Sequence, residues 1–171
     1  VVVVGEGPGG LFASLRLIEL GLRPVVLERG KDVRQRKVDL ANITKTQTVD
    51  PESNYCFGEG GAGAFSDGKL NTGTKDPRHR FILEQFVSCG APEDILIDAK
   101  PHIGTDRLHI ALQGLRRELL DLGADIRFES RLTDLQAADG HLEAITAEGP
   151  EGTYTMPCRR LVLALGHSAR D

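Results

Sequence analysis

The sequence of 171 residues has few cysteines, no tryptophan and no long hydrophobic run. Its cysteines, Cys56, Cys89 and Cys158, are odd in number and far apart, which argues against a disulfide framework and against a zinc site. No apolar stretch approaches the roughly 18 residues of a transmembrane helix, and the apolar opening lacks the basic flank of a signal peptide. We therefore predict no metal site, no membrane span and a cytoplasmic protein.

An excess of basic charge is also missing. The 21 Lys and Arg residues against 25 Asp and Glu residues give a formal net charge of −4, which argues against a nucleic-acid partner. The length suffices for one substantial core. Because the sequence starts inside a predicted strand without an initiator methionine and stops just after another strand, we expect a piece of a longer protein. Residues 1–171 then form one incomplete nucleotide-binding domain, and the substrate domain lies outside this chain.

The opening thirty residues carry the strongest pattern. Four consecutive valines predict a short parallel strand that is buried on both faces. Gly5, Gly7 and Gly10 then fit G-x-G-x-x-G, in which the glycines allow a tight turn, close approach to a pyrophosphate and close packing of the next helix. We expect the pyrophosphate of a dinucleotide at that helix N-terminus, because backbone N–H groups and the helix dipole favour negative charge there.

The next strand ends in an acidic residue. Residues 24–27 form a second short apolar run that closes on Glu28, 23 positions after Gly5. A carboxylate about 20 residues past the glycine turn is positioned to accept a hydrogen bond from the adenosine ribose. The charged stretch that follows is a helix or loop with a thin apolar stripe of Val33, Lys37 and Leu40. Its charges are either a solvated face or, for Arg29 and Arg36, groups that reach the cofactor.

A second glycine cluster lies in a loop of about residues 55–73. Long loops inside compact domains are often functional, so we treat this loop as a second candidate site, with a plain surface loop as the alternative. Residues 63–69 also match most of a P-loop. Leu70 stands where a Ser or Thr would hold magnesium, however, so we do not expect a nucleoside-triphosphate site.

The second half of the sequence predicts helices and then a three-stranded meander. Helices are expected from Asp76 to Gly90 and from Thr105 to Gly123. Strands of a meander follow at about residues 131–157, with Asp139-Gly140 as a two-residue hairpin turn. Residues 161–166 then return as a further parallel strand of the main sheet. The expected fold class is therefore α/β, a Rossmann-like domain with a parallel central sheet, helices and an antiparallel β-meander.

On these residues the chain resembles the FAD-binding part of the glutathione-reductase-like flavoproteins. Residues 1–10, 28–29 and 163–166 stand at that superfamily's first nucleotide motif, ribose carboxylate and A-T-G-type motif, although Leu165 replaces the usual threonine. Within the superfamily, the stretches 57–63, 66–70, 101–106 and 166–171 resemble the signatures of a bacterial family of FAD-dependent dehydrogenases.

The resemblance implies an FAD-dependent oxidoreductase that performs hydride transfer, with NAD(P)H as a candidate electron donor. It implies FAD bound extended, with the adenosine toward Glu28 and the isoalloxazine toward the part outside this chain. No catalytic residue is assigned, and the fragment alone is expected to be inactive. The expected cofactor contacts are Gly5, Gly7, Pro8, Gly9, Gly10, Glu28, Arg29, Arg36, Gly60, Gly61, Ser66, Lys69, Leu132, Ala164 and Gly166.

Two alternatives remain open. The first is a flavin- or nucleotide-binding module without its own turnover, such as a redox sensor or a tRNA-modification partner. The second is an NAD(P) domain, which the meander disfavours. Disulfide reductases carry two redox cysteines on the loop that here holds Cys56, and Cys56 has no neighbouring cysteine in the sequence. The substrate, the electron acceptor and the oligomeric state are not specified by these residues.

Overall fold

The computed structural model describes residues 1–70, 75–98, 100–167 and 169. Its centre is a parallel sheet of four strands in the order β3-β2-β1-β7. Val3 of β1 pairs with Val26 of β2 on one side and with Val162 of β7 on the other. The strands are β1 (Val2–Val4), β2 (Val25–Leu27), β3 (Asp125–Arg127) and β7 (Leu161–Leu163).

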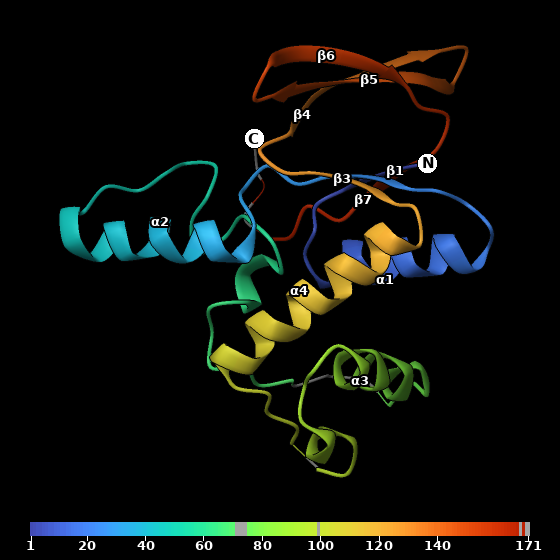
Figure 1. The fold of residues 1–171 in the computed structure, drawn as a ribbon. Coiled ribbons are helices and arrows are strands. Elements are labelled where there is room, and N and C mark those ends of the chain that lie inside the picture. Colours follow the sequence, from blue (N-terminus) through green and yellow to red (C-terminus); the bar gives the residue numbers. More distant parts are fainter. Residues whose placement is uncertain (71–74, 99, 168, 170–171) are drawn as a thin grey trace.

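The three residues of β1 are all buried, because both faces of the parallel sheet are covered. A separate antiparallel sheet lies over one face, and helices cover the other, which gives three layers (Figure 1). The core between the two sheets combines Val2, Val4 and Leu27 with Ile145 and Ala147. The unalternated valine run of the sequence therefore marks the middle layer, as predicted.

The antiparallel sheet is the predicted meander. Its strands are β4 (Arg131–Ala138), β5 (His141–Gly149) and β6 (Gly152–Pro157), in the order β4-β5-β6. Asp139 and Gly140 join β4 to β5 with φ values of +51° and +75°. Positive φ at both central residues is what a type I′ hairpin turn requires, so the Asp-Gly signal is confirmed.

The helical layer contains α1 (Pro8–Glu19) and α4 (Thr105–Asp121), and α3 (Arg78–Ser88) packs beneath α4 (Figure 1). Two short 3₁₀ helices, η1 (Gly61–Gly63) and η2 (Glu93–Leu96), interrupt the connecting segments. The apolar spacing of residues 108–122 predicts one buried face for the long helix, and the structure confirms it except at Leu122, which follows the helix and is exposed. The buried residues of the helix are Leu108, His109, Ala111, Leu112, Leu115 and Leu119.

The charged segment after Glu28 is a helix, α2 (Val33–Thr46), which projects from the body (Figure 1). Asp32 caps it, since its Oδ1 accepts from the Arg34 N–H at 2.8 Å. The buried stripe is Val33, Arg36 and Leu40, whereas Lys37 is exposed, which corrects the predicted stripe. An arginine three residues after Val33 occupies the inward position that the sequence pattern assigned to Lys37.

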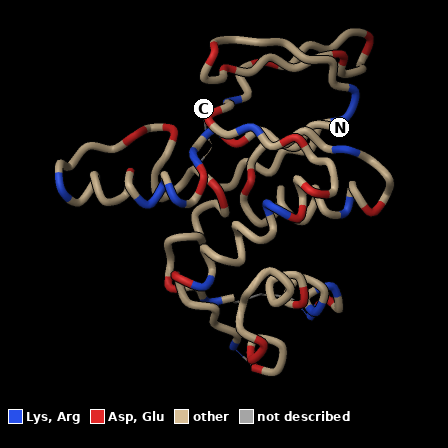
Figure 2. The backbone as a smooth tube through the Cα atoms, in the orientation of Figure 1, with Lys and Arg blue, Asp and Glu red and all other residues tan. Residues whose placement is uncertain are grey.

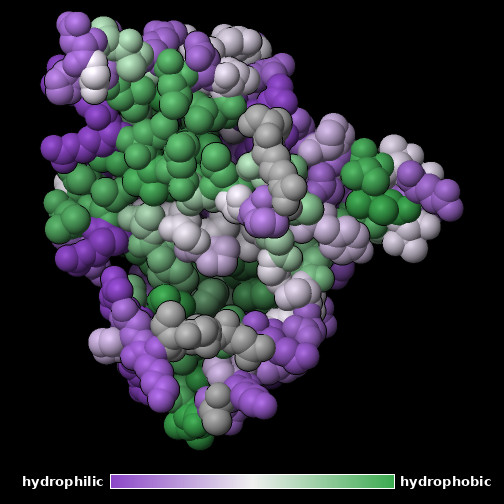
Figure 3. Space-filling model, turned by 180° about the vertical axis from the view of Figure 1, so that it is seen from behind, coloured by the Kyte–Doolittle hydropathy of each residue, from purple (hydrophilic) through white to green (hydrophobic). Residues whose placement is uncertain are grey.

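On the face seen from behind, hydrophobic residues gather over the meander and the adjoining part of the parallel sheet (Figure 3). β7 pairs with β1 alone, and Leu163 and Leu165 are exposed. Within the described ranges, no helix is long and apolar enough to cross a membrane, and no three His, Cys, Asp or Glu side chains group to hold a metal. Residues 71–73 of the predicted glycine-rich loop and residues 168, 170 and 171 lie outside the described residues.

Candidate functional site

The glycine turn brings β1, β7 and α1 into close contact. Gly5 has a φ of +99°, and a Cβ placed on it would lie 2.3 Å from the carbonyl oxygen of Ala164. A Cβ on Gly10 would lie 1.8 Å from the carbonyl oxygen of Gly5. Neither position can accept a side chain without moving backbone, so these two glycines are required by the fold itself.

Gly7 differs from both. Its φ of −74° and ψ of −178° are open to any residue. A Cβ there would meet Gly61 Cα at 3.6 Å, an ordinary contact. The backbone conformation at Gly7 therefore does not require glycine. The absence of a side chain at Gly7 leaves space between the turn and the glycine-rich loop.

Glu28 joins three segments of the chain. The residue is buried, with 5% of its surface exposed. Oε2 accepts from the Glu6 N–H at 2.8 Å, while Oε1 accepts from the N–H groups of Gly30 and Gly58, both at 2.9 Å. A carboxylate offers about four acceptor positions, so roughly one stays available for a hydroxyl. Glu28 thus fixes the glycine turn and the glycine-rich loop to the end of β2.

These segments enclose a cleft of about 690 Å³ at the carboxyl ends of β1 and β2. The N-terminus of α1 opens into it, and the N-cap residue Gly7 supplies no side-chain cap. The free N–H groups of such a helix end favour an anion. Ten of the residues expected at a cofactor line this cleft: Gly5, Gly7, Pro8, Gly9, Glu28, Arg29, Gly61, Leu132, Ala164 and Gly166.

Five expected residues are placed elsewhere. Gly10 lies beneath the turn against Gly5, and the N–H of Gly60 donates to the Glu6 carbonyl at 2.9 Å. Ser66 Oγ donates to the Gly63 carbonyl at 2.7 Å, and exposed Lys69 pairs with Asp67 at 2.6 Å. Ser66 and Lys69 stabilise turns of their own loop and are not among the residues that line the cleft.

Arg36 is the fifth of these residues, and it is fully buried. Burial lowers the pKa of its guanidinium to about 10, partly offset by Glu28 and Glu59, so it stays protonated at neutral pH. The side chain holds the glycine-rich loop in shape instead of reaching a phosphate. Its nitrogens donate to the carbonyl groups of Asn54 (2.8 Å), Tyr55 (3.1 Å), Gly58 (3.3 Å), Glu59 (2.8 Å) and Gly61 (2.8 Å).

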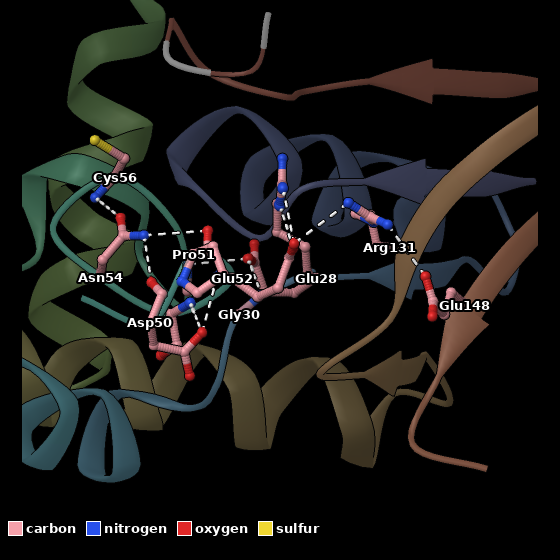
Figure 4. A network of polar contacts seen from close by, with 12 residues as sticks. Glu28, Gly30, Asp50, Pro51, Glu52, Asn54, Cys56, Arg131 and Glu148 are labelled. Carbon is pink, nitrogen blue, oxygen red and sulfur yellow. Dashed lines mark hydrogen bonds and ion pairs between the residues drawn. The ribbon is translucent and has the colours of Figure 1, made fainter. Parts of the chain in front are cut away.

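The rim of the cleft carries a chain of ion pairs. Glu52 accepts from Arg29 at 2.7 Å and from Arg131 at 3.3 Å, and Arg131 also pairs with Glu148 at 3.1 Å (Figure 4). The Arg29 guanidinium lies 4.1 Å from the centre of the Phe57 ring. Acidic and basic residues are interspersed along the chain (Figure 2), and here they meet at one edge of the site.

Other lining residues were not among the expected cofactor contacts, although several belong to the glycine-rich loop that the sequence marked as a second candidate site. The segment from Ser130 to Thr133 lines the cleft because the chain passes over the ends of the parallel strands on its way from β3 to β4. This path of the chain follows from the order of the strands, which the sequence predicted. The additional lining residues are Val4, Leu27, Cys56, Phe57, Gly58, Ala62, Ser130, Arg131, Thr133, Leu165, His167 and Ala169.

No family model matches the sequence. A protein of Clostridium beijerinckii, described as an uncharacterized protein, is 46% identical over 170 residues, which are 99% of this chain and 31% of that protein. The chain thus spans about a third of the length of this relative.

Solved structures share the fold across nearly the whole chain. OxyS anhydrotetracycline hydroxylase from Streptomyces rimosus is 25% identical with a TM-score of 0.50, over 96% of this chain and 31% of that one. The p-nitrophenol 4-monooxygenase PnpA from Pseudomonas putida is 17% identical with a TM-score of 0.55, over 96% and 40%. A 3-ketosteroid dehydrogenase from Rhodococcus jostii is 17% identical with a TM-score of 0.58, over 95% and 44%. The chain therefore has the α/β fold that is also found in this hydroxylase, this monooxygenase and this dehydrogenase, with a parallel sheet of four strands and a separate antiparallel sheet of three.

Proposed function

We propose that this chain is the FAD-binding part of a flavin-dependent oxidoreductase that transfers hydride through FAD. One observation carries the proposal: the carboxylate of Glu28 and the uncapped N-terminus of α1 open into the same cleft. A hydroxyl acceptor and an anion site side by side are what the ribose and pyrophosphate of an adenine dinucleotide need. The shared fold with a hydroxylase, a monooxygenase and a dehydrogenase supports the same reading.

In this proposal each wall of the cleft binds a different group of the cofactor. The ribose hydroxyl groups bind Glu28, and the pyrophosphate binds the N–H groups at the start of α1 beside Gly61. The adenine lies toward the segment of Leu132, with Arg29 at the rim. Ala164 and Gly166 border the path toward the flavin ring.

Bound FAD would supply the hydride chemistry. The residues of this chain would bind the cofactor, fix its direction and keep water from its pyrophosphate. None of them is assigned as an acid or a base. The residues that receive the substrate are proposed to lie in the rest of the protein, since the chain covers 31% of its relative.

The test is the visible spectrum of the intact protein after purification. We expect flavin absorption that bleaches when a suitable electron donor is added. Flavin absorption that no donor bleaches would favour a binding module without turnover. A colourless protein that binds neither FAD nor another adenine dinucleotide would contradict the proposal.

Cys56 offers an independent measure of occupancy. It is exposed and lines the cleft, whereas Cys158 is buried and burial raises the pKa of Cys89 to about 11. Thiol alkylation should therefore modify Cys56 first. We expect saturating FAD to slow that alkylation several-fold, as followed by mass spectrometry of the digested protein. An unchanged rate of Cys56 alkylation would place FAD outside this cleft.

A further inference from the structure

A buried carboxyl group occupies the glycine turn itself. Glu6, between Gly5 and Gly7, has no exposed surface. Both of its backbone polar groups form hydrogen bonds: the N–H donates to the Glu28 carboxylate at 2.8 Å, and the carbonyl accepts from the Gly60 N–H at 2.9 Å. Neither carboxyl oxygen has a hydrogen-bond partner among the described residues. An ionised carboxylate in that position would lack the compensation that buried charges require.

A second buried carboxyl group comes from the glycine-rich loop. Glu59 has no exposed surface, and its Oε2 accepts from the Val33 N–H at 2.6 Å and from Arg116 at 3.1 Å. Its Oε1 has no partner among the described residues. Burial raises the pKa of Glu59 as well, while the Val33 N–H and Arg116 favour its charged form. Because Glu59 has these two donors and Glu6 has none, Glu6 is the group of the two that keeps a proton.

Charges from four elements face Glu6. They are Glu59 from the glycine-rich loop, Glu28 from the end of β2, Asp32 from the cap of α2, and the cation Arg116 from α4. Burial raises the pKa of Glu6 well above its ordinary value. Glu59, Glu28 and Asp32 raise it further, whereas Arg116 lowers it. Because these three acidic residues outnumber the one cation named with them, a negative charge on buried Glu6 would be electrostatically unfavourable.

We propose that a proton on Glu6 holds the glycine-rich loop against the glycine turn, and that loss of this proton separates the two walls of the cleft. The contact at stake is direct: the Gly60 N–H donates to Glu6, and a Cβ on Gly61 would lie 3.2 Å from Gly7 Cα. A negative charge on Glu6 would repel the negative charge of Glu59, which the glycine-rich loop carries. The consequence for FAD rests on the proposed function, whereas the consequence for stability does not.

The direction of the pH effect follows from linkage. A glutamic acid has an ordinary pKa near 4.5 when the chain is unfolded, and that of folded Glu6 is raised. The folded state therefore holds its proton more tightly, so the stabilisation is complete below about pH 4.5 and is lost as the pH rises through the raised pKa. Between the two values the folding equilibrium constant should fall about tenfold per pH unit from this group alone.

The experiment compares the intact wild-type protein with Glu6→Gln and with the exposed control Glu151→Gln, from pH 6 to pH 9. Infrared spectra should show the carbonyl stretch of a buried carboxylic acid in the wild type and in Glu151→Gln, and not in Glu6→Gln. The denaturant concentration at the midpoint of unfolding should fall with rising pH in the wild type and in Glu151→Gln. It should fall less in Glu6→Gln. If Glu6→Gln does not fold, Glu59→Gln takes its place, because Glu59 is the other fully buried glutamate of this contact: the buried-acid band should persist in that variant and disappear at high pH.

Two outcomes would overturn the proton-dependent contact: no buried-acid band in the wild type, or the same pH dependence in Glu6→Gln and the wild type. Titration with FAD separates this inference from the proposed function. If FAD never binds but Glu6→Gln flattens the stability profile, the contact stands and the cofactor assignment falls. If FAD binds with the same pH dependence in all three proteins, the assignment stands and the proton on Glu6 does not control the cleft.

Discussion

Replacing Glu28 by alanine should cost the protein roughly 4 kcal/mol or more of unfolding free energy, because it leaves buried N–H groups of Glu6, Gly30 and Gly58 without an acceptor. Each such group costs about 1–3 kcal/mol when its partner is removed. The same change removes the proposed ribose acceptor, so FAD binding should be lost as well. Urea unfolding of the intact protein measures the first effect, and FAD titration measures the second.

The control for Glu28 is Glu151→Ala, which removes an exposed carboxylate in the turn between β5 and β6. A surface change of this kind should shift the stability by less than about 0.5 kcal/mol. Glu28→Gln should fall between the two, because its amide oxygen can still accept while its amide nitrogen meets an N–H donor. If Glu28→Ala unfolds at the same urea concentration as Glu151→Ala, the three hydrogen bonds do not hold the site together.

Gly7→Val should leave the protein folded and weaken FAD binding by roughly 100-fold or more through steric overlap. The backbone of Gly7 has a φ of −74°, and a Cβ there makes an ordinary 3.6 Å contact with Gly61 Cα. The valine methyl groups would instead fill the space in which a pyrophosphate approaches the turn. Circular dichroism checks the fold, and FAD titration checks the binding.

Two other glycines provide matched comparisons. Gly63→Val introduces the same side chain where no atom lies within 4 Å of the added Cβ, so FAD affinity should be unchanged. Gly5→Ala adds a smaller group at a φ of +99° against the Ala164 backbone, so it should destabilise the fold. Unaltered FAD affinity in folded Gly7→Val would show that the cofactor does not pass this turn.

The middle of the fold could be predicted because its signals are local. The valine run, the tight turn of the G-x-G-x-x-G spacing and the Asp139-Gly140 hairpin turn each depend on a few neighbouring residues, and the structure confirms all three as elements of the fold. The position of Glu28 at a strand end also follows from local sequence. Its hydrogen bond to Gly58, thirty residues away, does not, so the sequence indicated a ligand contact and gave no sign of a structural one.

Arg36 shows why the rest could not be predicted. On a charged helix, an arginine that donates to buried carbonyl groups has the same sequence signature as one that reaches solvent or a phosphate. Distinguishing them requires knowing that the segment from Asn54 to Gly61 folds back over α2. Ser66 and Lys69 were similarly ambiguous, because small and charged residues are common both in binding loops and in self-stabilised turns.

The most direct measurement is a crystal structure of the intact protein with FAD bound. We expect the pyrophosphate within hydrogen-bonding distance of the N–H groups at the start of α1, and a ribose hydroxyl on Glu28. FAD bound outside the cleft between the glycine turn and the glycine-rich loop, or a ribose that does not contact Glu28, would contradict the assignment.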